Sequence, residues 1–119
     1  MGHQHEVTGT SWVVEHVGGE PVTGRAPVLD LGADGRLGGT TGVNRVVGEF
    51  TVDGSVLRFG AIITTRMAGS PEAMAQEQAW LALLEGDVPY AVDGDRLVLL
   101  PGTASAPAGA ELVRTEPVD

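Results

Sequence analysis

Short runs of alternating apolar and polar residues follow one another along most of the chain, separated by Gly, Pro and Asp. Alternation places successive side chains on opposite faces of a strand. Asp53-Gly54 separates two such runs, and this dipeptide is a strong signal for a tight hairpin. The pattern predicts short antiparallel strands over 11–17, 27–31, 36–41, 46–52, 55–59, 61–66, 88–92, 97–100 and 111–115.

One segment has the pattern of a helix instead. Ser70-Pro71-Glu72 combines an N-capping hydroxyl, a proline suited to the first helical position and an acid in the first turn. No Gly, Pro or β-branched residue follows until Gly86, which supplies a stop. The predicted fold class is mainly β: a small antiparallel β-barrel or strongly curved sheet of about eight strands with one α-helix over about 71–85. Its apolar face is suited to lie on a sheet or to plug a barrel.

Composition supports one globular domain. The 119 residues include 42% hydrophobic and 19% charged positions, and 18 glycines and seven prolines favour a turn-rich β protein. We expect a single domain over 9–115, with an N-terminal tail at 1–8 and a C-terminal tail at 116–119. No apolar run is long enough to span a membrane as a helix.

The charge balance narrows the partners. The chain contains sixteen acidic residues and seven arginines, which give a net charge of −9. Nucleic-acid binding is excluded, because it requires clustered basic residues. An anionic membrane surface is an equally poor partner. We expect a monomer whose partner is a protein or an apolar small molecule.

The histidines and the absence of cysteine leave little catalytic chemistry. Alternation places His16 on one face with Trp12 and Val14, which indicates packing rather than general-base catalysis. His3 and His5 alone are too few ligands for a metal. Without cysteine there is no thiolate nucleophile and no disulfide. The sequence therefore predicts no catalytic residue, no metal and no cofactor.

Other polar motifs are explained by structure. Residues 30–34 and 93–95 resemble calcium loops in composition only, and turn chemistry accounts for them. The glycines at 38–42 lack the lysine and the helix of a phosphate loop. Arg66 and Glu77 are interpreted as a strand–helix ion pair, with a ligand-facing pair as the alternative.

A series of motifs in order along residues 9–114 resembles the META domain family, which includes the heat-shock lipoprotein HslJ. The motifs are Gly9-Thr10-Ser11-Trp12, Gly42-Val43-Asn44-Arg45, Gly48-Glu49-Phe50, Thr65-Arg66-Met67-Ala68-Gly69, residues 74–81 and Gly94-Asp95-Arg96-Leu97. The residues singled out by the resemblance, with structural roles implied, are Trp12, Gly42, Asn44, Arg45, Gly48, Thr65, Arg66, Met67, Glu77 and Leu81.

The chain departs from the family pattern at two positions. Val43 and Gly69 stand where the family carries two cysteines. The resemblance therefore implies that these two positions lie close in space, and that this chain lacks a staple which relatives carry. At Asn44, next to Val43, we expect the side chain to satisfy backbone groups that the turn leaves unpaired.

The resemblance implies a non-enzymatic binding module associated with stress or the cell envelope. A lipid- or small-molecule-binding barrel, an uncharacterised enzyme and a purely structural accessory domain are the alternatives. A cysteine-free chain without a recognisable signal peptide favours the cytoplasm; removal of a signal peptide would instead indicate the cell envelope or secretion.

Overall fold

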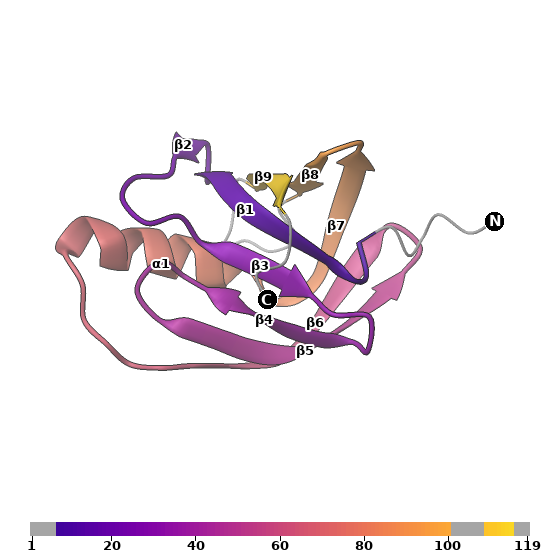
Figure 1. The fold of residues 1–119 in the computed structure, drawn as a ribbon, viewed down its shortest axis with the longest axis horizontal. Coiled ribbons are helices and arrows are strands. Elements are labelled where there is room, and N and C mark those ends of the chain that lie inside the picture. Colours follow the sequence, from indigo (N-terminus) through magenta and orange to yellow (C-terminus); the bar gives the residue numbers. More distant parts are fainter. Residues whose placement is uncertain (1–6, 101–108, 116–119) are drawn as a thin grey trace.

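The computed structural model describes residues 7–100 and 109–115, which form nine strands and one helix (Figure 1). No helix in the described ranges is long and apolar enough to cross a membrane. The elements are β1 (Thr10–Val17), β2 (Glu20–Pro21), β3 (Val28–Leu31), β4 (Arg36–Thr40), β5 (Arg45–Asp53), β6 (Val56–Thr64), α1 (Pro71–Leu83), β7 (Gly86–Asp93), β8 (Arg96–Leu99) and β9 (Ala110–Thr115).

The strands form a closed antiparallel barrel. Each of β3 to β8 pairs with the strand that follows it, and β1 pairs with both β3 and β9. That last pairing closes a ring of eight strands, while β2 adds a short ninth strand beside the end of β1. The predicted mainly β fold with one helix is therefore confirmed, and the barrel rather than an open curved sheet is the arrangement found.

Tight turns connect the strands where the sequence predicts them. Asp53 pairs with Val56 across the β5–β6 hairpin, and Gly54 in its turn has a φ of 62°. A different glycine permits close packing between strands: a Cβ on Gly39, in β4, would overlap the backbone carbonyl of Val28 in β3. The backbone at Gly39 also has a φ of 136°, which L side chains rarely adopt.

Side chains fill the interior of the barrel. Trp12 is completely buried, and its indole Nε1 donates a hydrogen bond to Oγ1 of Thr10 over 2.7 Å. The Thr10 hydroxyl in turn donates to the carbonyl oxygen of Val7. Val7, which the sequence assigns to the tail, is itself fully buried. The core continues through Val14, Leu29, Leu31, Leu57, Trp80, Leu83, Val88, Leu97, Leu99 and Leu112.

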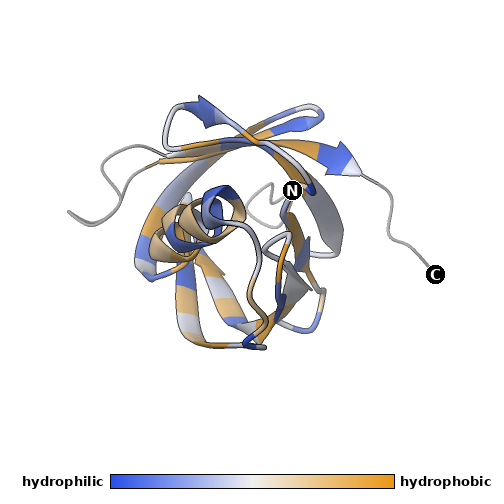
Figure 2. Ribbon diagram, turned by 90° about the vertical axis from the view of Figure 1, so that its left-hand side faces the viewer, coloured by the Kyte–Doolittle hydropathy of each residue, from blue (hydrophilic) through white to orange (hydrophobic). Residues whose placement is uncertain are grey.

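Helix α1 lies inside the outline of the ring of strands in Figure 2, and in Figure 1 its first turns extend beyond one end of the barrel. Ser70 caps it as predicted, because its Oγ accepts a hydrogen bond from the Ala73 N–H at 3.1 Å. The helix ends at Leu83, slightly earlier than the predicted limit. Its buried side chains are Glu77, Trp80 and Leu83, so this face of the helix plugs one end of the barrel, whereas Gln78 and Ala79 are exposed.

Two strand predictions require correction. A register shift between Val14 and His16 turns Val17, not His16, toward the core. Such a bulge adds a residue to one strand and reverses the alternation beyond it. In addition, the two strands predicted over 55–59 and 61–66 form one strand, β6, because the ladder with β5 resumes after a second bulge between Gly48 and Phe50.

Candidate functional site

A polar cluster with a buried centre joins α1 to the barrel: Thr41, Asn44 and Glu77 are buried, whereas Thr65 and Met67 are exposed. Its members are Thr41, Asn44, Thr65, Glu77 and the backbone of Met67, and we call it the Glu77 junction. Glu77 is only 6% exposed. Its Oε2 accepts hydrogen bonds from the Thr41 hydroxyl at 2.6 Å and from the Asn44 side-chain amide at 2.7 Å. Two donors thus satisfy a carboxylate that would be costly to bury alone.

Asn44 is the centre of this junction. Its Nδ2 also donates to the carbonyl oxygen of Met67 at 3.1 Å. Its Oδ1 accepts from the Thr65 hydroxyl at 2.9 Å and from the Met67 N–H at 2.6 Å. One side chain therefore connects the start of β5, the segment after β6 and the helix.

The contacts of the Glu77 junction connect three segments of the chain. Every polar atom named above has a partner within the cluster, and the hydroxyl of Thr41 is committed to Glu77. A nucleophile would need an adjacent base and a space for a reacting atom. The Thr41 hydroxyl does lie beside the Glu77 carboxylate, but Thr41 is completely buried and its hydroxyl also accepts from the Asn44 N–H at 2.9 Å, so these contacts hold the segments together.

The remaining motif residues contribute no side chain to this cluster, although the Arg45 N–H donates to the Thr65 hydroxyl at 3.0 Å. Leu81 is half-buried on α1 and Trp12 lies in the core. Gly42 has a φ of 96°, and a Cβ there would overlap the backbone carbonyl of Arg25. A Cβ on Gly48 would lie 2.8 Å from the backbone oxygen of Ala61, so both glycines permit close backbone packing.

Arg66 does not pair with Glu77, and the predicted ion pair is wrong. The side chains of Arg45 and Arg66 are exposed and make no hydrogen bond or ion pair within the described residues. Glu77 instead points to Asn44 and Thr41. The sequence could indicate that Glu77 is buried, because helical spacing places it on the same face of α1 as Trp80. The sequence could not indicate its partners, because they come from distant segments that pack against the helix.

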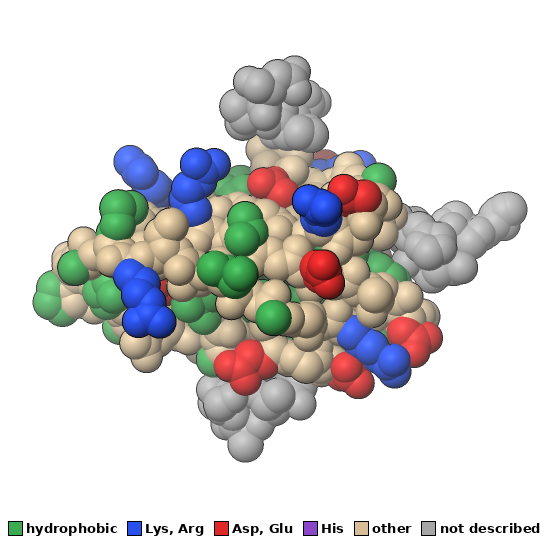
Figure 3. Space-filling model, turned by 90° about the horizontal axis from the view of Figure 1, so that it is seen from below, with side chains coloured by type: hydrophobic (Ala, Val, Ile, Leu, Met, Phe, Trp, Pro, Cys, Tyr) green, Lys and Arg blue, Asp and Glu red, His purple; other side chains and the backbone are tan. Residues whose placement is uncertain are grey.

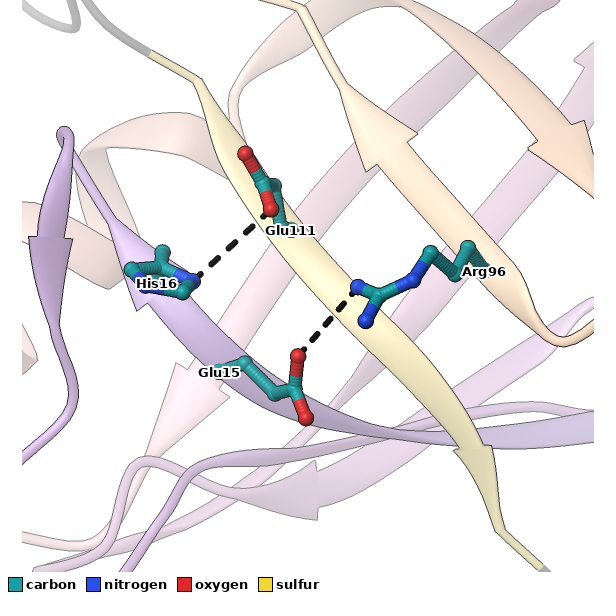
Figure 4. A network of polar contacts seen from close by, with 4 residues as sticks. All are labelled: Glu15, His16, Arg96 and Glu111. Atoms are coloured by element: carbon teal, nitrogen blue, oxygen red, sulfur yellow. Dashed lines mark hydrogen bonds and ion pairs between the residues drawn. The ribbon is translucent and has the colours of Figure 1, made fainter.

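His16 lies on the outside of the barrel, in a pair of surface contacts (Figure 4). Its Nδ1 is 3.8 Å from Oε1 of Glu111, and the side chain is 43% exposed. Beside it, Arg96 donates to Glu15 at 3.3 Å. Such exposed contacts contribute little to stability. No group of three or more His, Cys, Asp or Glu able to hold a metal occurs in the described part of the chain.

The outer surface carries exposed apolar side chains. Val47 in β5 and Ile63 in β6 are directly paired across the strands, and they are 55% and 68% exposed. Met67, just beyond β6, is 57% exposed. We call these three residues the Val47 face. In Figure 3, hydrophobic and arginine side chains occupy the left part of this side of the molecule, and most acidic side chains lie toward its right.

The protein is an antiparallel β-barrel plugged by one helix. The Glu77 junction connects the helix to the strands, and the apolar side chains of the Val47 face are exposed on the outer surface. A model of the META domain family matches residues 5–117. The chain therefore belongs to the META domain family.

Solved structures share this fold. One NMR structure superposes with a TM-score of 0.77 at 21% identity, covering 95% of each chain. An NMR structure of a protein from Burkholderia xenovorans gives a TM-score of 0.73 at 19% identity, covering 96% of this chain and 87% of the other. At these identities the likeness concerns the fold alone. No curated protein matches the sequence.

Proposed function

We propose that this META domain is a non-enzymatic protein-binding module that works through its outer surface. The observation that carries the proposal is the Val47 face. Large aliphatic side chains exposed side by side on a rigid sheet are typical of interaction surfaces. We include in this proposal that the protein acts in a stress response or at the cell envelope. This part rests only on its membership of the META domain family.

The barrel interior favours a protein partner over an apolar small molecule. Pockets for small ligands are concave and lined by apolar groups. Here Trp12 and Trp80 are buried in the ring together with leucines from several strands, and α1 plugs it. A depression of about 610 Å³ lies outside, but Asp34, Arg36 and Arg58 are among its lining residues. Its charged lining suits neither a lipid tail nor another apolar ligand.

Site-specific photo-crosslinking tests the proposal. A benzophenone side chain at Val47 should give a protein adduct of discrete mass in the native cells, and the same group at exposed Ala91 on β7 should not. The adduct should disappear when Ile63→Glu is added. The partner, once identified and purified, should bind the parent domain but not Ile63→Glu in calorimetry.

A second measurement addresses the competing function. A fluorescent fatty acid should show no saturable, displaceable binding to the purified domain, because Trp12, Trp80 and several leucines of the described residues occupy the interior of the barrel. Saturable binding of that probe, with no adduct at Val47, would replace the protein-binding proposal with a lipid-carrier function.

A further inference from the structure

Strands β6 and β7 pair along only part of their length. Their pairing runs from Val56, opposite Pro89, to Phe59, opposite Gly86, and ends there. Residues 60–64 continue β6: residues 62–64 pair with β5 alone, and residues 60 and 61 lie at the bulge. We call residues 60–64 the β6 edge, because on the side away from β5 no strand of the described chain lies against them.

The hydrogen-bonding groups of this edge can be assigned. The Thr65 N–H donates to the Arg45 carbonyl at 3.1 Å, so Thr65 faces β5. Backbone groups of an antiparallel strand alternate in direction, which turns Ile63 toward β5 and Ile62 and Thr64 away from it. The outward N–H and C=O groups of Ile62 and Thr64 have no hydrogen-bond partner among the described residues.

A groove runs beside these unpaired groups. It has a volume of about 340 Å³, and its lining includes Ile62, Thr64, Leu81, Leu84 and Glu85. The strand edge therefore forms one wall, and the other is formed by Leu81 near the end of α1 together with residues 84–86 just beyond the helix. A partly apolar channel next to free backbone donors and acceptors is an arrangement by which proteins bind an extended peptide as an added strand.

The charges at the two ends of the groove differ in sign. Arg66 lies just beyond Thr64, and Arg45 is paired with the next residue, Thr65. At the opposite end, Glu85 precedes Gly86, which is paired with Phe59. Arg66 and Glu85 are both exposed. The groove thus has a cationic end at Thr64 and an anionic end at residue 60.

We propose that the β6 edge binds an extended segment of a partner protein as an added antiparallel strand. The segment carries an acidic residue at its N-terminal end, alternating apolar residues in the middle and a basic residue at its C-terminal end. Antiparallel pairing fixes this order, because the added strand then runs from the Thr64 end toward Glu85. This inference deepens the proposed function and rests on it, since the added strand would lie next to Ile63 of the Val47 face.

A second copy of the chain fits this edge less well. Each copy carries a net charge of −9, so two copies repel each other. Leu81 in α1 and Leu84, the residue that caps the helix, also flank the edge, which leaves a channel beside β6 rather than an open sheet margin. A single extended segment enters such a channel more readily than the edge of another barrel.

Peptide titration followed by amide NMR tests the inference. The probe is acetyl-Glu-Thr-Val-Thr-Val-Thr-Lys-amide, and the control exchanges its terminal Glu and Lys. The probe should shift the amide resonances of Ile62 and Thr64, and the control should bind about tenfold more weakly, in line with exposed charge pairs at both ends. A double variant, Arg66→Glu with Glu85→Arg, keeps the net charge and should reverse this preference.

N-methylated probes separate strand addition from side-chain docking. Methyl groups on the peptide nitrogens that face β6 should abolish the shifts at Ile62 and Thr64, whereas methyl groups on the alternate nitrogens should leave binding within about threefold. Equal loss with both peptides would overturn the inference. So would a dimer in sedimentation that the probe dissociates, because the edge would then belong to a second copy.

The two proposals fail in different ways. Adducts at Val47 without any peptide shift at Ile62 and Thr64 would overturn strand addition and leave the binding module standing. Peptide shifts at the edge without an adduct at Val47 would support strand addition and remove the Val47 face from the proposed function.

Discussion

A disulfide between positions 43 and 69 should stabilise this barrel substantially. A Cβ placed on Gly69 would lie 3.2 Å from Cγ2 and 3.4 Å from Cγ1 of Val43. A cysteine sulfur at position 43 occupies nearly the place of one of these methyl groups. In a disulfide the sulfur of one cysteine lies about 3 Å from the Cβ of the other, so this placement is close to the one that the bond requires. The proximity implied by the family resemblance is present in this cysteine-free chain.

The size of the effect follows from the loop that the bond closes. Val43 and Gly69 enclose a loop of about 27 residues, for which the chain-entropy relation gives about 3.5 kcal/mol. The loss of the partly buried Val43 side chain offsets about 1 kcal/mol of this gain. For a domain of this size, about 2.5 kcal/mol corresponds to a rise of roughly 10 °C in Tm.

Thermal unfolding of the Val43→Cys, Gly69→Cys variant, followed by circular dichroism, measures this gain. The same protein in reductant is the matched control, because only the covalent bond differs. The single Gly69→Cys variant reports the effect of the added side chain on its own. If mild oxidation leaves the thiols free, or if the oxidised form melts no higher than the reduced form, the placement of these two segments is wrong.

Three further substitutions test the core, the junction and the strand contacts. Trp12→Ala should lower the free energy of unfolding by about 3–5 kcal/mol, and in a Trp80→Phe background the remaining Trp12 emission should be blue-shifted; emission near that of free tryptophan would contradict its burial. Asn44→Ala removes four hydrogen bonds and leaves the buried Glu77 carboxylate with one partner, so it should lower the free energy of unfolding by about 3 kcal/mol in denaturant titrations. The peptide-induced shifts at the β6 edge should persist well below Tm. Full stability with lost binding would instead make Asn44 a recognition residue. Gly39→Ala should prevent folding as judged by amide NMR, whereas Gly54→Ala, with open space around its Cβ, should cost about 1 kcal/mol; equal effects would refute the close approach of β3 and β4.

Local signals in the sequence predicted the elements that local chemistry determines. Ser70 and Pro71 mark the start of α1 because a capping hydroxyl and a fixed φ act within one turn. Asp53-Gly54 marks the β5–β6 turn for the same kind of reason. The burial of Trp12 likewise follows from alternation within a single strand.

Features that depend on distant segments were not predictable. The bulge before His16 is decided by the pairing of β1 with β9, so alternation within β1 alone assigned His16 to the wrong face. The partners of Glu77 come from segments more than thirty residues earlier in the chain. The β6 edge arises because β7 pairs with only part of β6, and no pattern within either strand reports where that pairing ends.

The closure of the barrel by β1 and β9 has a consequence for synthesis. The strand that seals the ring, Ala110–Thr115, is made about a hundred residues after its partner Thr10–Val17. A nascent chain released only as far as β8 therefore exposes two open edges, on β1 and on β8, which are templates for pairing with other chains. Translation that stalls before Ala110 should yield an aggregation-prone polypeptide that requires a chaperone, although most of its core residues have already been made.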